Sequence, residues 1–133
     1  MQSIKLNNNT LWSMESLGEV LYSGSTNNTL TLTKSVLNFK YVEIFYTDEV
    51  GRQTNSMRIE PKNGNTSSGD GLVCLGLIET ESDFVVLKNA TWMFNGNQFE
   101  KQKEEFTQIF HNGTIVGNNN TGWLWIKKIV GYN

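Results

Sequence analysis

The sequence has few of the residues that build disulfide-linked, metal-binding or nucleic-acid-binding proteins. Among 133 residues there is one cysteine, one histidine and one proline, and only 18% are charged. A single cysteine excludes an internal disulfide framework and a zinc site built from several cysteines. The formal net charge is −2 and no basic run occurs, whereas tight binding to nucleic acid requires a basic surface. We therefore expect no cofactor, no metal ion and no nucleic-acid partner.

Long apolar runs are also missing. Residues 1–5 lack the apolar segment of a signal peptide, and no run in the chain approaches the length of a membrane span. The expectation is a protein synthesised in a cytoplasm, without a signal peptide and without insertion into a membrane.

Asparagine, threonine, serine and glycine take the place of the missing charges. These residues suit the turns between strands and weaken long helices. Aromatic residues make up 11% and hydrophobic residues 38% of the chain, which is enough for one domain with its own core. We expect residues 1–19 to be a loosely ordered lead-in and residues 20–133 to form a single β-sandwich domain.

The segment 39–46 is the strongest strand signal in the chain, because it consists almost entirely of aromatic and β-branched residues. Side chains alternate between the two faces of a strand, and here both faces are mostly apolar. One face holds Val42, Ile44 and Tyr46, and the other holds Phe39, Tyr41, Glu43 and Phe45. If Glu43 is buried it needs a basic partner such as Lys40, Arg58 or Lys127; if exposed, it marks the solvent side.

Two further segments also read as strands that are apolar on both faces: 72–78, which is expected to be a second central strand, and 123–132, a long strand that closes the chain. A sandwich has one dry interface between its sheets, so three such strands are more than one sandwich needs. This excess indicates a face that is covered by copies of the same chain, and it favours a homo-oligomer.

The remaining chain alternates short strands with polar turns. Residues 39–60 read as a β-hairpin with Met57 and Ile59 directed inward, and Asn95–Asn97 is a strong hairpin turn. Strands are also expected at 83–87 and at 91–94. Residues 98–106 could form a helix, but strand or loop is preferred because the flanking segments are typical of hairpins. The prediction is an all-β fold, an antiparallel, jelly-roll-like β-sandwich of roughly nine strands with little or no helix.

Catalytic chemistry has little support in the sequence. A Cys74–His111 pair would need an exposed, activated thiol, whereas Cys74 lies in an apolar run and is expected to be buried. His111 has no metal-ligand spacing around it. Carboxylates for glycoside hydrolysis are available, but nothing singles out a pair, and the candidates are Asp70, Glu79, Glu81, Asp83, Glu100, Glu104 and Glu105. We expect a protein that is not an enzyme, and a small glycan-cleaving enzyme stays open as an alternative.

The four tryptophans suggest a binding role, although core packing is the competing interpretation for each. An aromatic ring can stack on a sugar while neighbouring polar side chains bond its hydroxyl groups. Tryptophans beside asparagine-rich turns have this combination. The candidate carbohydrate-binding residues are Trp92, Asn95, Asn97, His111, Asn118, Asn119, Asn120 and Trp123.

The order of strand motifs resembles a known class of viral proteins. A strand ending in Tyr22-Ser23-Gly24 is followed by Thr29–Val36 and by Asn38–Tyr46, and the chain closes with Trp123–Tyr132. This order resembles the C-terminal β modules of tail-fibre, baseplate and minor structural proteins from phages and prophages of Gram-positive bacteria. The resemblance covers about residues 20–60 and 89–133, and it includes no catalytic signature.

The resemblance implies a virion tail protein that is made in the cytoplasm of the host bacterium. It implies assembly as a homo-oligomer, with a trimer favoured, next to other tail proteins. It also implies a role near the host surface, because some such modules bind cell-wall saccharides. Our hypothesis for receptor binding is that several identical subunits present loops 61–71, 95–98 and 111–122 to a surface glycan. The alternative is a purely architectural protein that joins tail components.

Overall fold

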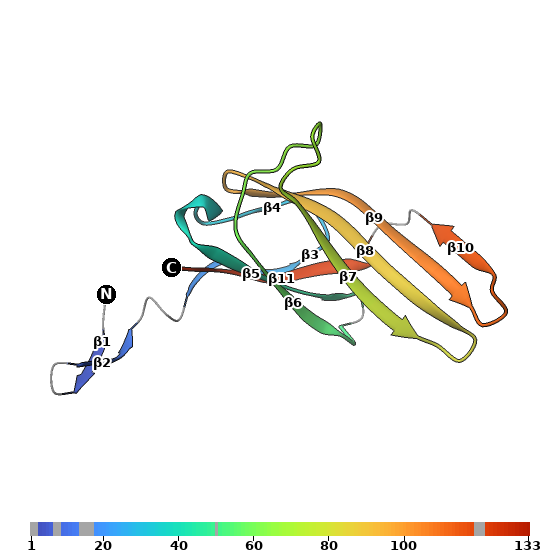
Figure 1. Cartoon of the computed structure of the whole chain (residues 1–133), viewed down its shortest axis with the longest axis horizontal. Helices are drawn as coiled ribbons and strands as arrows, with labels where there is room; N and C mark the ends of the chain where they lie inside the picture. Colours follow the sequence, from blue (N-terminus) through green and yellow to red (C-terminus); the bar gives the residue numbers. More distant parts are fainter. Residues whose placement is uncertain (1–2, 7–8, 14–17, 50, 119–121) are drawn as a thin grey trace.

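The computed structural model describes residues 3–6, 9–13, 18–49, 51–118 and 122–133. Its main body consists of two antiparallel sheets, one of five strands and one of four, which pack face to face (Figure 1). The predicted all-β sandwich of roughly nine strands is therefore confirmed. Apart from one 3-10 turn at Val36–Asn38, no helix occurs among the described residues. No helix in this part of the chain is long and apolar enough to cross a lipid bilayer.

The five-stranded sheet has the order β10-β9-β8-β7, with β4 also paired to β9. The four-stranded sheet has the order β3-β11-β5-β6. The bounds of the first sheet are β4 (Leu30–Thr31), β7 (Leu72–Thr80), β8 (Phe84–Asn95), β9 (Gln98–Phe110) and β10 (Ile115–Asn118). The bounds of the second are β3 (Glu19–Thr26), β5 (Tyr41–Asp48), β6 (Thr54–Ile59) and β11 (Leu124–Tyr132).

Two short strands precede the sandwich, within the segment 1–19. Strands β1 (Ser3–Leu6) and β2 (Asn9–Ser13) pair with each other as an antiparallel hairpin. In Figure 1 this hairpin lies apart from the two sheets. Residues 1–2, 7–8 and 14–17 of the predicted lead-in lie outside the described residues.

The core fills the space between the sheets. Strand β5 contributes Val42, Ile44 and Tyr46, the inward face that the alternation predicts. The Tyr46 hydroxyl donates a hydrogen bond of 3.0 Å to the Gly76 carbonyl of β7, which ties the two sheets together. The five-stranded sheet contributes an aromatic stack, with ring centroids 4.9 Å apart for Trp92 and Phe99.

The segment 72–78 is not a central strand. It lies within β7, which is an edge strand of the five-stranded sheet and whose residues alternate strictly between exposed and buried. Val73, Leu75 and Leu77 face the core, whereas Cys74 is exposed, so the expectation of a buried thiol was wrong. Strand β11, which covers most of the predicted strand 123–132, is central because it lies between β3 and β5.

The hairpins follow the sequence prediction closely. Strands β5 and β6 pair as predicted, and Met57 and Ile59 pack against the core. The two strands predicted at 83–87 and 91–94 form the single strand β8, which turns at Gly96 into β9. Gly96 has φ of 60°, a conformation that suits glycine in a tight turn. Residues 98–106 belong to β9, so the preference for strand over helix is confirmed.

Candidate binding site on the outer face of the four-stranded sheet

The predicted tryptophan platforms are engaged inside the protein. Trp92 is 0% exposed and stacks on Phe99 in the core, so no face of its ring is open to a sugar. This corrects the prediction for Trp92, whose position on the inner face of β8 decides its role. Trp123 is half-buried, with its ring edge-on to Phe106 at 5.1 Å and the Lys88 ammonium 4.9 Å from its centroid.

The predicted polar site residues do not come together. Asn95 and Asn97 flank the turn at one end of the β8–β9 hairpin, where the Gly96 amide donates to Asn63 Oδ1 of loop 61–71. His111 lies at the opposite end of β9, where its amide donates to the Asp83 carbonyl. Two of the three predicted loops therefore meet, whereas the β9–β10 turn, with which the third begins, lies at the other end of the sheet (Figure 1).

Asn118 is the last residue of β10, while Asn119 and Asn120 lie outside the described residues. At the other end of β10, His111 lines a surface pocket of about 440 Å³ together with Asp83, Phe110 and Asn112. This pocket lies next to the turn between β9 and β10 and contains none of the other predicted site residues.

A second pocket, which suits a ligand better, lies on the outer face of the four-stranded sheet, where β5 ends and β11 begins. Its volume is about 340 Å³, which is in the range of small-molecule sites. The residues that line it come from β3, β5, β11 and the turn after β5, and they are Ser25, Thr47, Asp48, Glu49, Gly51, Trp125 and Lys127.

Strand alternation explains why an aromatic ring lies in this pocket. Leu124 and Ile126 are fully buried in the core, so Trp125 between them points outward. Trp125 pairs with Thr47 across the β5–β11 ladder, which places the two side chains next to each other. The indole N–H of Trp125 donates to the Gly122 carbonyl at 3.0 Å and fixes the ring. The ring itself is only partly buried.

Among the described residues, Thr47, Trp92 and Trp123 each have a buried polar side-chain atom without a hydrogen-bond partner, and Thr47 is the one that lines this pocket. Thr47 is 5% exposed, and its hydroxyl oxygen has no hydrogen-bond partner among the described residues. An unpaired buried hydroxyl costs about 1–3 kcal/mol, so its presence beside a pocket needs an explanation. The hydroxyl oxygen is itself buried, so its unpaired state is a cost to the fold and not a contact that a ligand in the pocket can reach.

Next to the pocket, a buried ionic cluster joins the two sheets. Lys88 of β8 contacts Glu79 of β7 at 2.9 Å and Glu49 at 3.1 Å. Arg52 bridges Asp48 and Glu79, at 3.2 and 3.1 Å. Burial raises the pKa of Asp48, but hydrogen bonding with Glu79 and from Arg52 outweighs it, so the pKa lies below its ordinary value. The two cations, Arg52 and Lys88, lie between the carboxylates of Asp48, Glu49 and Glu79 and link the two sheets.

A second group of aromatic and charged residues lies on the same outer face, at the far end of β5. The rings of Tyr41 and Tyr132 stack at 5.1 Å, and the Arg58 guanidinium lies 4.9 and 5.3 Å from their centroids. The Arg58 guanidinium also donates a hydrogen bond of 3.2 Å to the Glu43 carboxylate. The Ser56 hydroxyl donates a hydrogen bond of 2.8 Å to the same carboxylate.

Glu43 thus lies on the solvent side of β5 and pairs with Arg58, which was one of its expected partners. The hydrogen bond from Ser56 and the Arg58 charge hold the pKa of Glu43 below its ordinary value. Burial and the Glu43 carboxylate raise the pKa of Tyr132.

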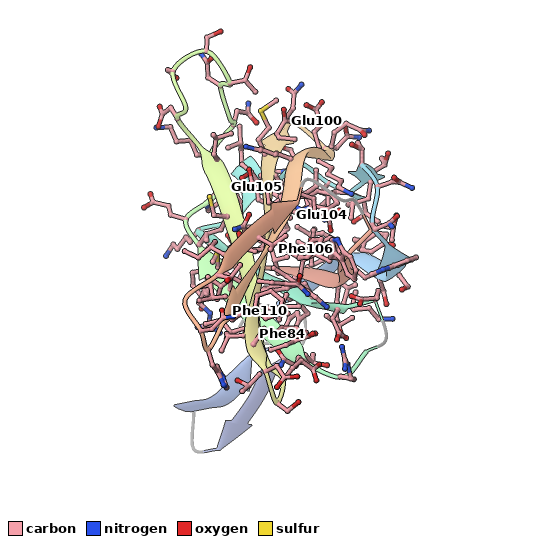
Figure 2. The ribbon with its side chains drawn as sticks, turned by 90° about the vertical axis from the view of Figure 1, so that its right-hand side faces the viewer. Phe84, Glu100, Glu104, Glu105, Phe106 and Phe110 are labelled. Carbon is pink, nitrogen blue, oxygen red and sulfur yellow. The ribbon has the colours of Figure 1, made fainter. Side chains whose placement is uncertain are left out.

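Glu104 is a residue whose role the sequence did not reveal. Its carboxylate is buried and accepts hydrogen bonds of 2.6 Å from the Gly122 and Leu124 amides, and it pairs with Lys101 at 2.7 Å. It therefore anchors the start of β11 to β9. Along β9, Glu104 and Phe106 lie on one face of the strand and Glu105 on the other (Figure 2). Glu104 has a structural role, because both of its oxygens already accept hydrogen bonds from the start of β11.

Trp125 could have been found from the sequence. The run Trp123-Leu124-Trp125-Ile126 alternates, and placing Leu124 and Ile126 in the core puts Trp125 outside. Within the described part of the chain, no group of three or more histidine, cysteine or acidic side chains is arranged to hold a metal ion. No family model, no curated protein and no solved structure matches this chain.

Proposed function

We propose that this domain is a receptor-binding module of a phage tail tip or fibre that recognises a host surface glycan. The observation that carries the proposal is the Trp125 pocket, in which a partly buried indole ring lies beside the polar side chains of Ser25 and Lys127. A sugar ring has an apolar face that stacks on an aromatic ring, and its hydroxyl groups bond neighbouring polar atoms. The pocket replaces the predicted loop site, because Trp92 is buried and the loops do not converge.

Self-association is the second part of the proposal. An aliphatic stripe runs across the outer face of the five-stranded sheet, through neighbouring positions of four strands. It consists of Ile78, Val85, Leu87, Ile109 and Ile115. Ile78 is 63% and Ile115 67% exposed, and the stripe includes no charged residue. A surface of this kind suits a copy of itself, and we propose a homo-oligomer, with a trimer favoured.

The two parts support each other. A single shallow pocket binds a sugar weakly, whereas several copies facing one cell surface bind together with far higher avidity. The four-stranded sheet and the aliphatic stripe lie on opposite outer faces of the sandwich. Association through the stripe therefore leaves the Trp125 pocket accessible in every subunit.

The test is binding of the purified domain, displayed on beads at high density, to a glycan array and to purified walls of Gram-positive bacteria. We expect retention on at least one wall glycan, and loss of this retention in Trp125→Ala. The matched control is Leu72→Ala, which changes an exposed side chain on the opposite sheet. Absence of binding to every glycan and wall preparation would contradict the proposal.

The stripe also favours a second candidate function, that of an architectural protein that joins tail components. In that case the stripe would contact another tail protein and the pocket would have no ligand. Substitutions in the stripe would then abolish incorporation into virions, while Trp125→Ala virions would adsorb to the host normally.

A further inference from the structure

The outer face of the four-stranded sheet carries two separate groups of aromatic side chains, which we call the two stations. The first is the Trp125 pocket, and the second is the Tyr41–Tyr132 pair with Arg58 beside it. The strand register fixes their separation, because Trp125 pairs with Thr47 and Tyr132 pairs with Tyr41. Thr47 and Tyr41 are six residues apart on β5, which corresponds to about 20 Å along the strand.

Partly buried and exposed side chains of three strands lie between the stations. Glu43 and Phe45 of β5 are half-buried and point to the same side as Tyr41. Phe45 pairs with Lys128 of β11 on one side and with Ser56 of β6 on the other, and Lys128 is exposed. An aromatic ring thus lies midway, flanked by a hydroxyl and an ammonium group that can bond to sugar hydroxyls.

We infer that the ligand is a linear oligosaccharide that lies along β5 and β11, from the Trp125 pocket to the tyrosine pair. This inference rests on the proposed function. With bonds of about 1.5 Å a pyranose unit is about 5 Å long, so about four units span the two stations. The indole ring holds one end of the segment, and Arg58, which has five N–H donors, holds hydroxyl groups at the other.

An extended chain fits this surface better than a terminal sugar does. A site for one terminal sugar needs a single enclosed pocket, whereas here polar and aromatic side chains line the sheet over six positions of β5. The Arg58 side chain is 57% exposed although it already pairs with Glu43, so its remaining donors are accessible. The tyrosine pair and the salt bridge hold the guanidinium in place before the ligand binds.

The experiment measures affinity against ligand length. Fragments of the array-positive polysaccharide, from single sugars to octasaccharides, are titrated into the domain by calorimetry. We expect the affinity to rise with each unit up to about four and then to level off. Trp125→Ala should weaken binding at every length. Arg58→Ala should weaken only fragments of about four units or more, by about threefold to tenfold.

Tyr132→Ala is a second variant for the same station, and thermal unfolding establishes that each variant is folded. Should Tyr132→Ala fail to fold, Arg58→Ala still decides, because that side chain is largely exposed. Equal affinity for a disaccharide and an octasaccharide, with no effect of Arg58→Ala, would overturn the linear site while leaving the pocket proposal intact. Absence of binding at any length would overturn both.

Discussion

The two outer faces of the sandwich present different chemistry, although both belong to antiparallel sheets. On the four-stranded sheet, Trp125, Tyr41 and Tyr132 alternate with hydroxyl, acidic and basic groups. On the five-stranded sheet, the aliphatic stripe from Ile78 to Ile115 crosses four strands without a charged residue. The first face can bond the hydroxyl groups of a ligand, whereas the second can only remove apolar surface from water.

The two faces therefore suit two different functions, glycan binding and self-association, which one face could not serve at the same time. A sugar site has to remain accessible to solvent and ligand, and an association surface has to be covered. Because the two faces lie on opposite sides of the core, a change on one face should leave the other intact. The predictions below test that independence.

The largest effect is expected from charge in the aliphatic stripe. Ile109→Asp with Ile115→Asp places carboxylates at two paired positions, and burying them in an interface is unfavourable. We expect the oligomer to dissociate to monomers and the avidity for a glycan-coated surface to fall about a hundredfold or more. Light scattering gives the mass, and surface plasmon resonance gives the avidity.

The control for this variant is the affinity of a single site for a soluble oligosaccharide, which should not change. A wild-type chain that is already monomeric at high concentration would contradict the proposed role of the stripe.

On the opposite face, Trp125→Ala removes the stacking ring. We expect the affinity for a soluble fragment to fall about tenfold to a hundredfold, because the apolar area of the ring and its stacking on the sugar are lost. The mass of the oligomer should stay the same. Trp125→Phe keeps an aromatic ring but loses the hydrogen bond to Gly122, and it should recover part of the affinity. If both variants bind like wild type, the pocket is not the sugar site.

Thr47→Val should raise stability and leave binding unchanged. Valine has nearly the same shape and removes a buried hydroxyl without a partner among the described residues, so we expect a gain of about 1 kcal/mol in stability. The hydroxyl oxygen is buried beneath the pocket surface, so the affinity for a soluble fragment should stay the same. Chemical denaturation and calorimetry measure the two quantities. Lower stability in Thr47→Val would indicate that the hydroxyl is paired in the free protein.

The sequence predicted strands better than it predicted which faces of those strands are buried. Alternation in segment 39–46 correctly placed Val42 and Ile44 on one face, since that pattern is local, but only the structure shows that this face is the core face. Strand 72–78 is just as apolar, yet it is an edge strand with Ile78 exposed, because its position depends on pairing with β8 alone. Pairing between distant segments leaves no local signal.

The candidate site shows the same limit. Trp92 and Trp125 are similar in local sequence, each lying in a strand with apolar neighbours. Trp92 is buried because its face of β8 meets the second sheet, and Trp125 is partly exposed because its face of β11 points away from the first. Composition indicated a polar and aromatic surface, but only the strand register shows that Trp125 and Thr47 are neighbours.

The smallest expected effect is a difference in acid sensitivity between the two faces. The pKa values of Glu43 and Asp48 lie below the ordinary values of 4.5 and 3.8. A lowered pKa contributes stability that is present above the ordinary pKa and is lost as the pH falls through the folded-state pKa. The free energy of unfolding should therefore decrease as the pH is lowered from about 5 to about 3.

Glu43→Gln isolates the part of this pH dependence that belongs to the glycan-binding face. Its partner Arg58 is largely exposed, so the Glu43 contribution should be below about 1 kcal/mol, and the variant should lose less stability than wild type between these pH values. The aliphatic stripe has no titratable side chain, so the mass of the folded oligomer should stay constant over the same range. An oligomer that dissociates in acid before the domain unfolds would show that charged groups outside the stripe take part in the association, and the two faces would then not be independent.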